Sequence, residues 1–71
     1  MTILQMKYYA AVCHWQNITR AAEALHIAQP TLSIAMRTLE EETGLNLFRH
    51  VGRNIEMTAD GVSLFQQVTR L

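Results

Sequence analysis

The chain has 71 residues, of which 49% are hydrophobic, so it forms one small domain or a piece of a larger protein. No run approaches the roughly 20 apolar residues of a transmembrane helix and no signal peptide is visible, which argues against the membrane-spanning and secreted classes. The single cysteine, Cys13, cannot form an internal disulfide, and this fits a cytoplasmic protein. Six basic and six acidic residues cancel to a net charge of zero, whereas nucleic-acid binders are commonly basic.

A first helix is predicted from Ile3 to Trp15. Thr2 and Gln5 have the spacing of a capping box, in which each side chain bonds a backbone N–H of the other residue. Apolar residues at helical spacing predict the face of this helix that packs on the core. They are Leu4, Tyr8, Ala11, Val12 and Trp15, widened by Met6, Tyr9 and Cys13.

Two short helices joined by a tight turn are predicted next. The first covers Arg20 to His26, with Thr19 as the residue that caps its N-terminus. The second runs from Pro30 to Glu42, because proline suits the first helical position, where its missing N–H would have no partner. Its buried stripe repeats at i, i+3, i+4 and i+7. The stripe consists of Leu32, Ala35, Met36 and Leu39.

The opposite face of the second helix carries short polar groups, one cation and one aliphatic residue. Its members are Thr31, Ser33, Ile34, Arg37 and Thr38. A merely solvated helix would more often carry glutamate and lysine there, whereas small hydroxyl residues allow close approach and can bond bases and phosphates. The pattern is typical of a helix-turn-helix with Pro30 to Thr38 as the recognition helix.

A short hairpin is predicted after Gly44, which ends the second helix. Residues typical of strands flank the polar turn Val51-Gly52-Arg53-Asn54, within Asn46 to Met57. Following a helix-turn-helix, such a hairpin is a wing, with Arg53 at its tip. Thr58 then caps a last helix, whose apolar positions extend to Leu71 with no stop signal, so we expect this helix to continue in a longer protein.

The order and spacing of these motifs resemble a known family. The run TRAAEALHIAQPTLS, followed by RTLEEETGLNLF, then GR and MTADG, is similar to the N-terminal DNA-binding domain of LysR-type transcriptional regulators. The resemblance covers nearly the whole chain and implies a mainly α, winged helix-turn-helix fold with a three-helix core. It further implies a DNA-binding domain over residues 1–58 and the start of a linker helix over residues 59–71, which pairs with a second subunit.

As implied by the resemblance, the partner is double-stranded DNA, bound by a homodimer or homotetramer of the full-length protein. The domain itself needs no cofactor and catalyses no reaction. A small-molecule effector would act only through a further domain beyond Leu71. The site would be a palindrome of the T-N11-A form, with half-sites related by the two-fold axis of the dimer.

Carried over by position, the resemblance points to Gln29, Pro30, Thr31 and Ser33 at the start of the recognition helix. Gln29 can pair with an adenine edge or cap the helix, and the two hydroxyls can bond bases, phosphates or the helix end itself. Free N–H groups at the helix start also favour a phosphate. Arg37 can reach a phosphate or a guanine, and Arg53 can reach the backbone or the minor groove, where a guanidinium is favoured by the concentrated negative potential.

The chain departs from the family pattern at three positions. Ile34 stands where the family often has a basic residue that reads bases, and it can pack against a thymine methyl, so a shifted base preference is expected. His50 stands where the family commonly has arginine, and Arg49, one place earlier, faces the other way by strand alternation. Trp15 stands where the family is often polar, so it lies either on the core stripe or at an exposed contact.

Other classes of function receive less support. The three histidines and Cys13 lack the paired spacing of metal ligands, so no metal site is expected. No carboxylate cluster or phosphate loop supports catalysis. A winged helix that docks a protein partner is the main alternative, and the zero net charge is its best support. Half of the acidic charge, however, lies at the far end of the second helix, in Glu40, Glu41 and Glu42.

Overall fold

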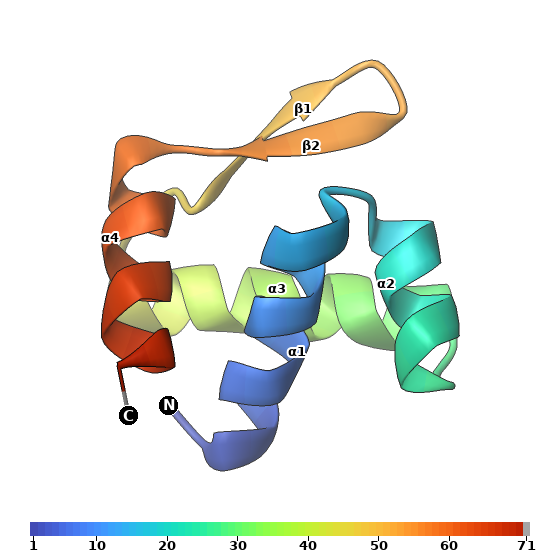
Figure 1. The fold of residues 1–71 in the computed structure, drawn as a ribbon, viewed down its shortest axis with the longest axis horizontal. Coiled ribbons are helices and arrows are strands. Elements are labelled where there is room, and N and C mark those ends of the chain that lie inside the picture. Colours follow the sequence, from blue (N-terminus) through green and yellow to red (C-terminus); the bar gives the residue numbers. More distant parts are fainter. Residues whose placement is uncertain (71) are drawn as a thin grey trace.

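The structure is a computed structural model that describes residues 1–70. Three helices form the body, a two-stranded hairpin projects from it, and a fourth helix returns alongside the first (Figure 1). The elements in order are α1 (Ile3–Trp15), α2 (Ile18–Leu25), α3 (Gln29–Thr43), β1 (Phe48–Val51), β2 (Asn54–Met57) and α4 (Ala59–Thr69). This is the predicted winged helix-turn-helix. In the described residues, no helix is both long and apolar enough to cross a membrane.

The core lies where α1, α2 and α3 meet under the base of the hairpin. Its largest fully buried side chains belong to Tyr9, Val12, Leu32, Leu39 and Leu47. Ala21 and Ala22 are exposed by 0% and 2%, and their small side chains allow α2 to approach the other helices closely. The core therefore joins the three helices of the body to the segment that leads into the hairpin and to β2.

The capping box predicted for α1 is present, with both bonds between Thr2 and Gln5. The predicted buried face of α1 is wrong in part, because the buried residues are Tyr9, Val12 and Cys13, while Leu4 and Trp15 are 55% and 43% exposed. The helix is apolar nearly all round, so its periodicity could not single out one face. Packing against α2, α3 and α4 decided which face of α1 is buried, and that face carries Tyr9, Val12 and Cys13.

The start of α2 corrects a second prediction. The cap is Asn17 and not Thr19, since the Asn17 side chain accepts a hydrogen bond from the Arg20 N–H at 2.9 Å. Asparagine is as good a cap as serine or aspartate, and it begins the helix two residues earlier than threonine would. At the other end, His26 adopts a left-handed conformation with φ 58° and closes the helix.

The predicted extent of α3 is confirmed to within one residue at each end. Gly44 ends this helix in the left-handed conformation, with φ 69°, as predicted. Pro30 occupies the second helical position and not the first, because Gln29 begins the helix after Ala28. Leu32, Met36 and Leu39 are buried, and Ala35 is half-buried, so the predicted stripe holds.

The hairpin pairs antiparallel with Phe48 opposite Met57 and Val51 opposite Asn54. This register leaves Gly52 and Arg53 as a two-residue turn. Gly52 has φ 61°, which glycine accommodates without steric cost at the first central position of a hairpin turn.

The last helix is anchored to α1 at its first turn. Thr58 caps it by accepting a hydrogen bond from the Gly61 N–H, as predicted. The Tyr9 hydroxyl donates to the Gly61 carbonyl oxygen at 2.5 Å. A Cβ at Gly61 would lie 2.3 Å from the Leu47 carbonyl oxygen, so only glycine fits there. The predicted extension of the helix to Leu71 lies outside the described residues, and the division at residue 58 stays a prediction.

Candidate nucleic-acid interface

The N-terminal half of α3 presents the side chains that the sequence singled out. Leu32 and Leu39 are fully buried and fix the inner face of this helix against the core. The buried leucines therefore also fix the position of the opposite, outer face of α3. The exposed residues on it are Gln29, Pro30, Thr31, Ile34, Arg37 and Thr38.

Two of the predicted residues are bonded to one another. The Gln29 side-chain amide donates to the Ser33 hydroxyl at 2.7 Å, one helical turn further on. Ser33 is half-buried, so its hydroxyl is held by this bond and not freely rotating in solvent. A base or phosphate that contacts either residue therefore meets an oriented pair.

The expectation of several free backbone N–H groups at this helix start is only partly met. Pro30 has no N–H, and the Thr31 N–H already donates to the Ala28 carbonyl oxygen at 3.1 Å. The helix start also lacks a side-chain cap, because Ala28 stands at the cap position. Side chains, more than backbone amides, are the donors that this end offers.

Ile34 is 60% exposed, which makes it one of the most exposed large apolar side chains in the described residues. Burying it against a thymine methyl would remove apolar surface from water on both sides. The exposed isoleucine that the sequence predicted is therefore present.

A hollow of about 190 Å³ separates α3 from the hairpin. Arg37 and Ser33 line it from α3, and His50 lines it from β1. Glu40 also lines this hollow, although the sequence analysis placed Glu40 at the far end of the helix, away from the binding side. Its carboxylate accepts a hydrogen bond from the Leu47 N–H at 2.8 Å, so it holds the segment that leads into the hairpin.

His50 is a candidate that the sequence reasoning did not include among its site residues. It is exposed, pairs with Ile55 across the hairpin, and joins Arg37 and Ser33 around the hollow. Strand alternation was the signal, since Ile55 is buried and His50 shares its face. Arg49 lies on the opposite face, as predicted, where its Nε is 3.7 Å from a carboxylate oxygen of Glu56.

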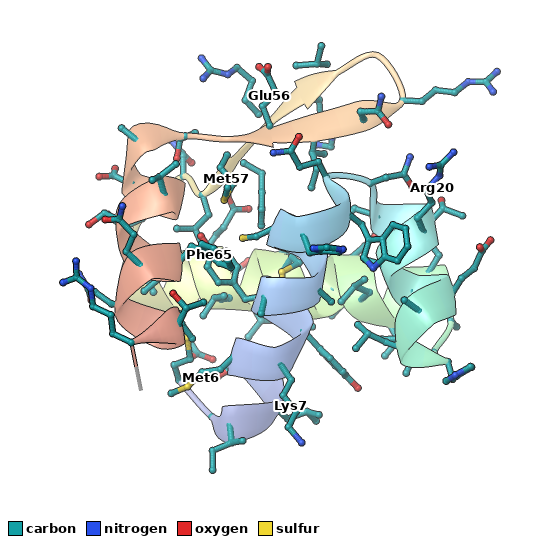
Figure 2. All side chains as sticks on the ribbon, in the orientation of Figure 1. Met6, Lys7, Arg20, Glu56, Met57 and Phe65 are labelled. Atoms are coloured by element: carbon teal, nitrogen blue, oxygen red, sulfur yellow. The ribbon has the colours of Figure 1, made fainter. Side chains whose placement is uncertain are left out.

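Arg53 is exposed at the tip of the hairpin, in a turn whose four residues are all exposed. Figure 2 shows the hairpin along one edge of the helical body, with Glu56 on β2 and Arg20 on α2. The structure brings Arg37, Ser33 and His50 together around a hollow, and leaves Arg53 apart at the tip.

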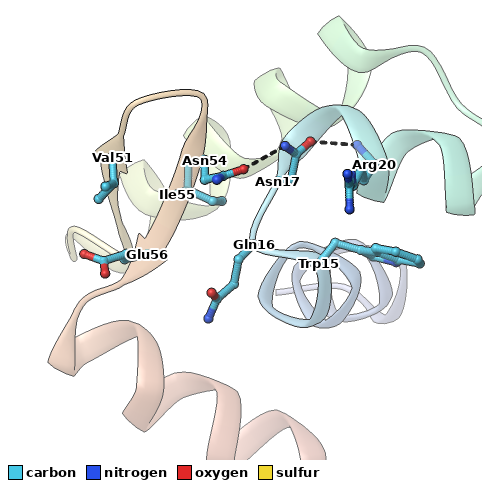
Figure 3. A pocket seen from close by; sticks show the side chains of 8 residues that line it. All are labelled: Trp15, Gln16, Asn17, Arg20, Val51, Asn54, Ile55 and Glu56. Carbon is cyan, nitrogen blue, oxygen red and sulfur yellow. Dashed lines mark hydrogen bonds between the residues drawn. The ribbon is translucent and has the colours of Figure 1, made fainter.

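A second hollow, of about 400 Å³, lies between the hairpin and the junction of α1 with α2 (Figure 3). Trp15 and Arg20 line it from the helices, and Asn54 and Glu56 line it from β2. The Asn17 side-chain amide donates to the Asn54 side-chain oxygen at 3.0 Å across its edge. Trp15 also contacts the imidazole of His14 edge-on, at 5.3 Å between ring centroids.

The buried titratable groups lie in the core and away from both hollows. Burial raises the pKa of the Cys13 thiol to about 11, and the hydrogen bond with Tyr9 partly opposes this. Burial likewise raises the pKa of the Tyr9 hydroxyl well above its usual value, with a smaller contribution from Cys13. Both groups are neutral at physiological pH; Cys13 packs in the core, and Tyr9 also holds α4 through its hydrogen bond to Gly61. In residues 1–70, no cluster of three histidine, cysteine or acidic side chains is suited to hold a metal ion.

Comparison with known proteins identifies relatives of this arrangement. Residues 3–62 match the family of bacterial regulatory helix-turn-helix proteins, lysR family. The HTH-type transcriptional regulator BudR of Klebsiella aerogenes is 38% identical over 71 residues, which are all of this chain and 50% of that protein. The HTH-type transcriptional regulator ClcR of Pseudomonas putida is 37% identical over the same length, 24% of its own. The chain thus spans half or less of these relatives.

Solved structures share the fold closely. The CbnR DNA-binding domain in complex with DNA superposes with a TM-score of 0.94 at 36% identity, over 99% of this chain and 80% of that one. The BenM DNA-binding domain in complex with benA site 1 DNA superposes with a TM-score of 0.93 at 36% identity, over 99% of this chain and 81% of that one.

Proposed function

The chain belongs to the LysR family of bacterial helix-turn-helix regulatory proteins, and we propose that it is the sequence-specific DNA-binding part of a transcription regulator. One observation carries the proposal. A helix anchored by fully buried leucines presents Thr31, Ile34 and Arg37 to solvent, beside a hairpin tipped with Arg53. The same fold, over 99% of this chain, has been solved in complex with DNA in two relatives.

In this proposal the start of α3 enters the major groove. An α-helix fits that groove, where each base pair presents a distinct set of donors, acceptors and methyl groups. The oriented Gln29–Ser33 pair and Thr31 supply hydrogen bonds, while Ile34 supplies an apolar contact. Pro30 lies at the same helix end, where a proline ring can contact the backbone or a base without needing a donor.

Arginine side chains supply the attraction to the phosphate backbone. Arg37 reaches a phosphate or guanine from α3, and Arg53 reaches the backbone or the minor groove from the hairpin tip. We add His50 to this group, because it lines the hollow that Arg37 also lines. With zero net charge, one copy of the domain has modest electrostatic affinity, so two copies acting together are needed for tight binding.

The wider role follows from the relatives. We propose a cytoplasmic regulator that binds double-stranded DNA as a homodimer or homotetramer, with two-fold symmetry matching a partly palindromic site. A small-molecule effector would bind a separate domain, as the chain spans only half or less of the relatives' length. This domain catalyses no reaction and needs no cofactor.

Selection from a random duplex library tests the proposal. The native chain and the double variant Ser33→Ala plus Arg53→Ala are each incubated with the library at about 50 mM and about 200 mM salt. Enrichment of a T-N11-A palindrome by the native chain, lost in the double variant, is the expected result. A matched control is Arg49→Ala, which removes an arginine from the outer face of the hairpin and leaves enrichment intact.

Other outcomes point elsewhere. Salt-sensitive retention without enrichment would contradict sequence-specific reading and leave a backbone binder. No retention at either salt concentration would favour the alternative that zero net charge supports, a winged helix that docks a protein partner. If that partner binds through an apolar interface, its affinity would fall little between the two salt concentrations.

A further inference from the structure

A polar contact joins the wing tip to a segment 37 residues earlier in the chain. Asn17 caps α2 through its side-chain oxygen, which accepts from the Arg20 N–H at 2.9 Å. Its side-chain nitrogen is left to donate to the Asn54 side-chain oxygen, at 3.0 Å. One amide thus joins the start of the helix-turn-helix to the residue that follows Arg53 (Figure 3).

A backbone bond lies beside this contact. The Ile55 N–H donates to the Gln16 carbonyl oxygen at 3.1 Å. Gln16 can offer that carbonyl because it adopts the left-handed conformation, with φ 51° and ψ 33°, at the end of α1. The α1–α2 junction therefore meets β2 at two consecutive residues, through a side chain at position 54 and through the backbone at position 55.

Apolar burial restrains the base of the hairpin and also Ile55 in β2, which is exposed by only 4%. The base is held by the buried Leu47 and by the ring of Phe48, whose centroid is 5.6 Å from that of Tyr9. From Val51 to Asn54, by contrast, every residue is exposed. Apolar burial therefore holds β2 as far as Ile55, and the direction of the four exposed tip residues depends on the turn and on polar contacts.

We propose that the Asn17–Asn54 contact is a positioning device that sets where Arg53 meets DNA. The inference rests on the proposed function, because Arg53 is taken as the wing residue that binds DNA. Asn54 acts through its neighbour and not by touching a phosphate. Asn17, in the same way, acts on DNA binding through the wing, beyond its role as a helix cap.

The first experiment needs no DNA and measures hydrogen exchange of the Ile55 amide by NMR in the 71-residue chain. Asn54→Ala removes the acceptor, and Asn17→Ser keeps a good helix cap but removes the amide donor. Each variant is expected to speed Ile55 exchange about threefold, the size expected of a weak exposed hydrogen bond. Asn54→Asp, which keeps an oxygen to accept from Asn17, is expected to retain the native rate. Unchanged Ile55 exchange in both Asn54→Ala and Asn17→Ser would overturn the proposal.

The second experiment is a double-mutant cycle on binding to a duplex of about 30 base pairs carrying a T-N11-A palindrome. Asn54→Ala is expected to weaken binding about threefold in the native chain and not at all when Arg53 is already alanine. Asn17→Ser should behave in the same way and add nothing to Asn54→Ala. Ser33→Ala provides the matched control, since its effect should be additive with that of Asn54→Ala.

The outcomes separate the inference from the function on which it rests. If the native chain binds the duplex but Asn54→Ala weakens it equally with or without Arg53, Asn54 touches DNA itself and the positioning role is wrong. If the native chain binds neither this duplex nor the random library, the proposed function fails. The proposal that Asn54 positions Arg53 on DNA then fails too. The exchange rate of the Ile55 amide still decides whether the Asn17–Asn54 contact holds the wing.

Discussion

The recognition helix and the wing flank the same hollow, yet they are held in place by different means. In α3, Leu32, Met36 and Leu39 are exposed by 4% or less, so the helix is fixed by apolar burial along its length. In the outer half of the hairpin no residue from Val51 to Asn54 is buried. Figure 1 shows the consequence, since α3 runs through the body of the domain whereas the hairpin tip stands away from it.

The two elements are therefore expected to differ in their sensitivity to mutation. Burial contributes roughly 25 cal/mol for each Å² of apolar surface and does not depend on one partner atom. An exposed hydrogen bond contributes about 1 kcal/mol or less and vanishes when either partner is removed. We therefore expect the position of α3 to be lost only when the fold is lost. The wing tip, in contrast, can be displaced while the fold is retained.

The largest effect is expected from breaking the anchor of α3. Leu39→Ala leaves a cavity at a fully buried site, and such changes cost about 2 to 5 kcal/mol of unfolding free energy. A domain of this size has little stability to lose, so a large fall in melting temperature by circular dichroism is expected. Ile34→Ala on the exposed face of the same helix is the matched control and should melt like the native chain. Equal melting of the two variants would contradict the anchoring of α3 by burial.

A second effect concerns the core beneath both elements at alkaline pH. Burial raises the pKa of Cys13 from 9.0 to about 11, so the folded state keeps the thiol protonated where the unfolded chain ionises. Unfolding then releases a proton, and stability is fully present below pH 9 and falls as the pH rises from about 9 to about 11. The raised pKa of Tyr9 extends this loss to higher pH. Urea denaturation at a series of pH values measures it, with an expected loss of about 1 to 3 kcal/mol.

Cys13→Ala provides the control for the alkaline loss. It lowers stability at every pH because it removes a packed side chain, and it should also flatten the pH dependence between 9 and 11. A slope unchanged from the native chain would show that another group is responsible.

A third prediction compares Arg37, which lines the hollow, with Arg53, which lies at the tip of the hairpin. Arg37→Ala and Arg53→Ala should each weaken binding to duplex DNA and reduce the slope of log affinity against log salt by about 1. Loss of Arg53 should reduce affinity with little change in melting temperature, since its side chain is exposed and makes no packing contact that the fold needs. An unchanged salt slope in either variant would remove that arginine from the interface.

The smallest change in affinity, but the clearest change in specificity, is expected at Ile34. Ile34→Arg replaces an exposed aliphatic side chain with a guanidinium that can donate to guanine. Binding of native and variant chains to a panel of half-sites should show a shift from thymine toward guanine at one position, worth about 1 to 3 kcal/mol of discrimination. If the base preference stays the same, Ile34 does not face a base.

Much of the fold could be predicted from the sequence, because local signals agreed with the tertiary structure. The capping box at Thr2, the glycine stop at Gly44 and the turn at Gly52 and Arg53 were all found at the predicted positions. The cap of α2 was misplaced, because Asn17 and Thr19 are both good caps and the choice depends on where the chain leaves α1.

The candidate site could be predicted on α3 and only in part on the hairpin. Ile34 and Arg37 are exposed because the stripe that buries Leu32, Met36 and Leu39 is regular. The position of His50 beside Arg37, and of Glu40 in the same hollow, depends on how the hairpin folds over α3. No spacing within the sequence reports that angle.

Local sequence patterns are sufficient to predict which segments form helices, where most of these helices stop, and that the hairpin turns at Gly52 and Arg53. These features arise from hydrogen bonds and steric limits between residues within about one helical or hairpin turn. The packed fold is needed to establish which face of α1 is buried, that Asn17 contacts Asn54, and that the Tyr9 hydroxyl donates to the Gly61 carbonyl oxygen, 52 residues away. Those features depend on contacts between distant segments, and such contacts exist only once the helices have packed.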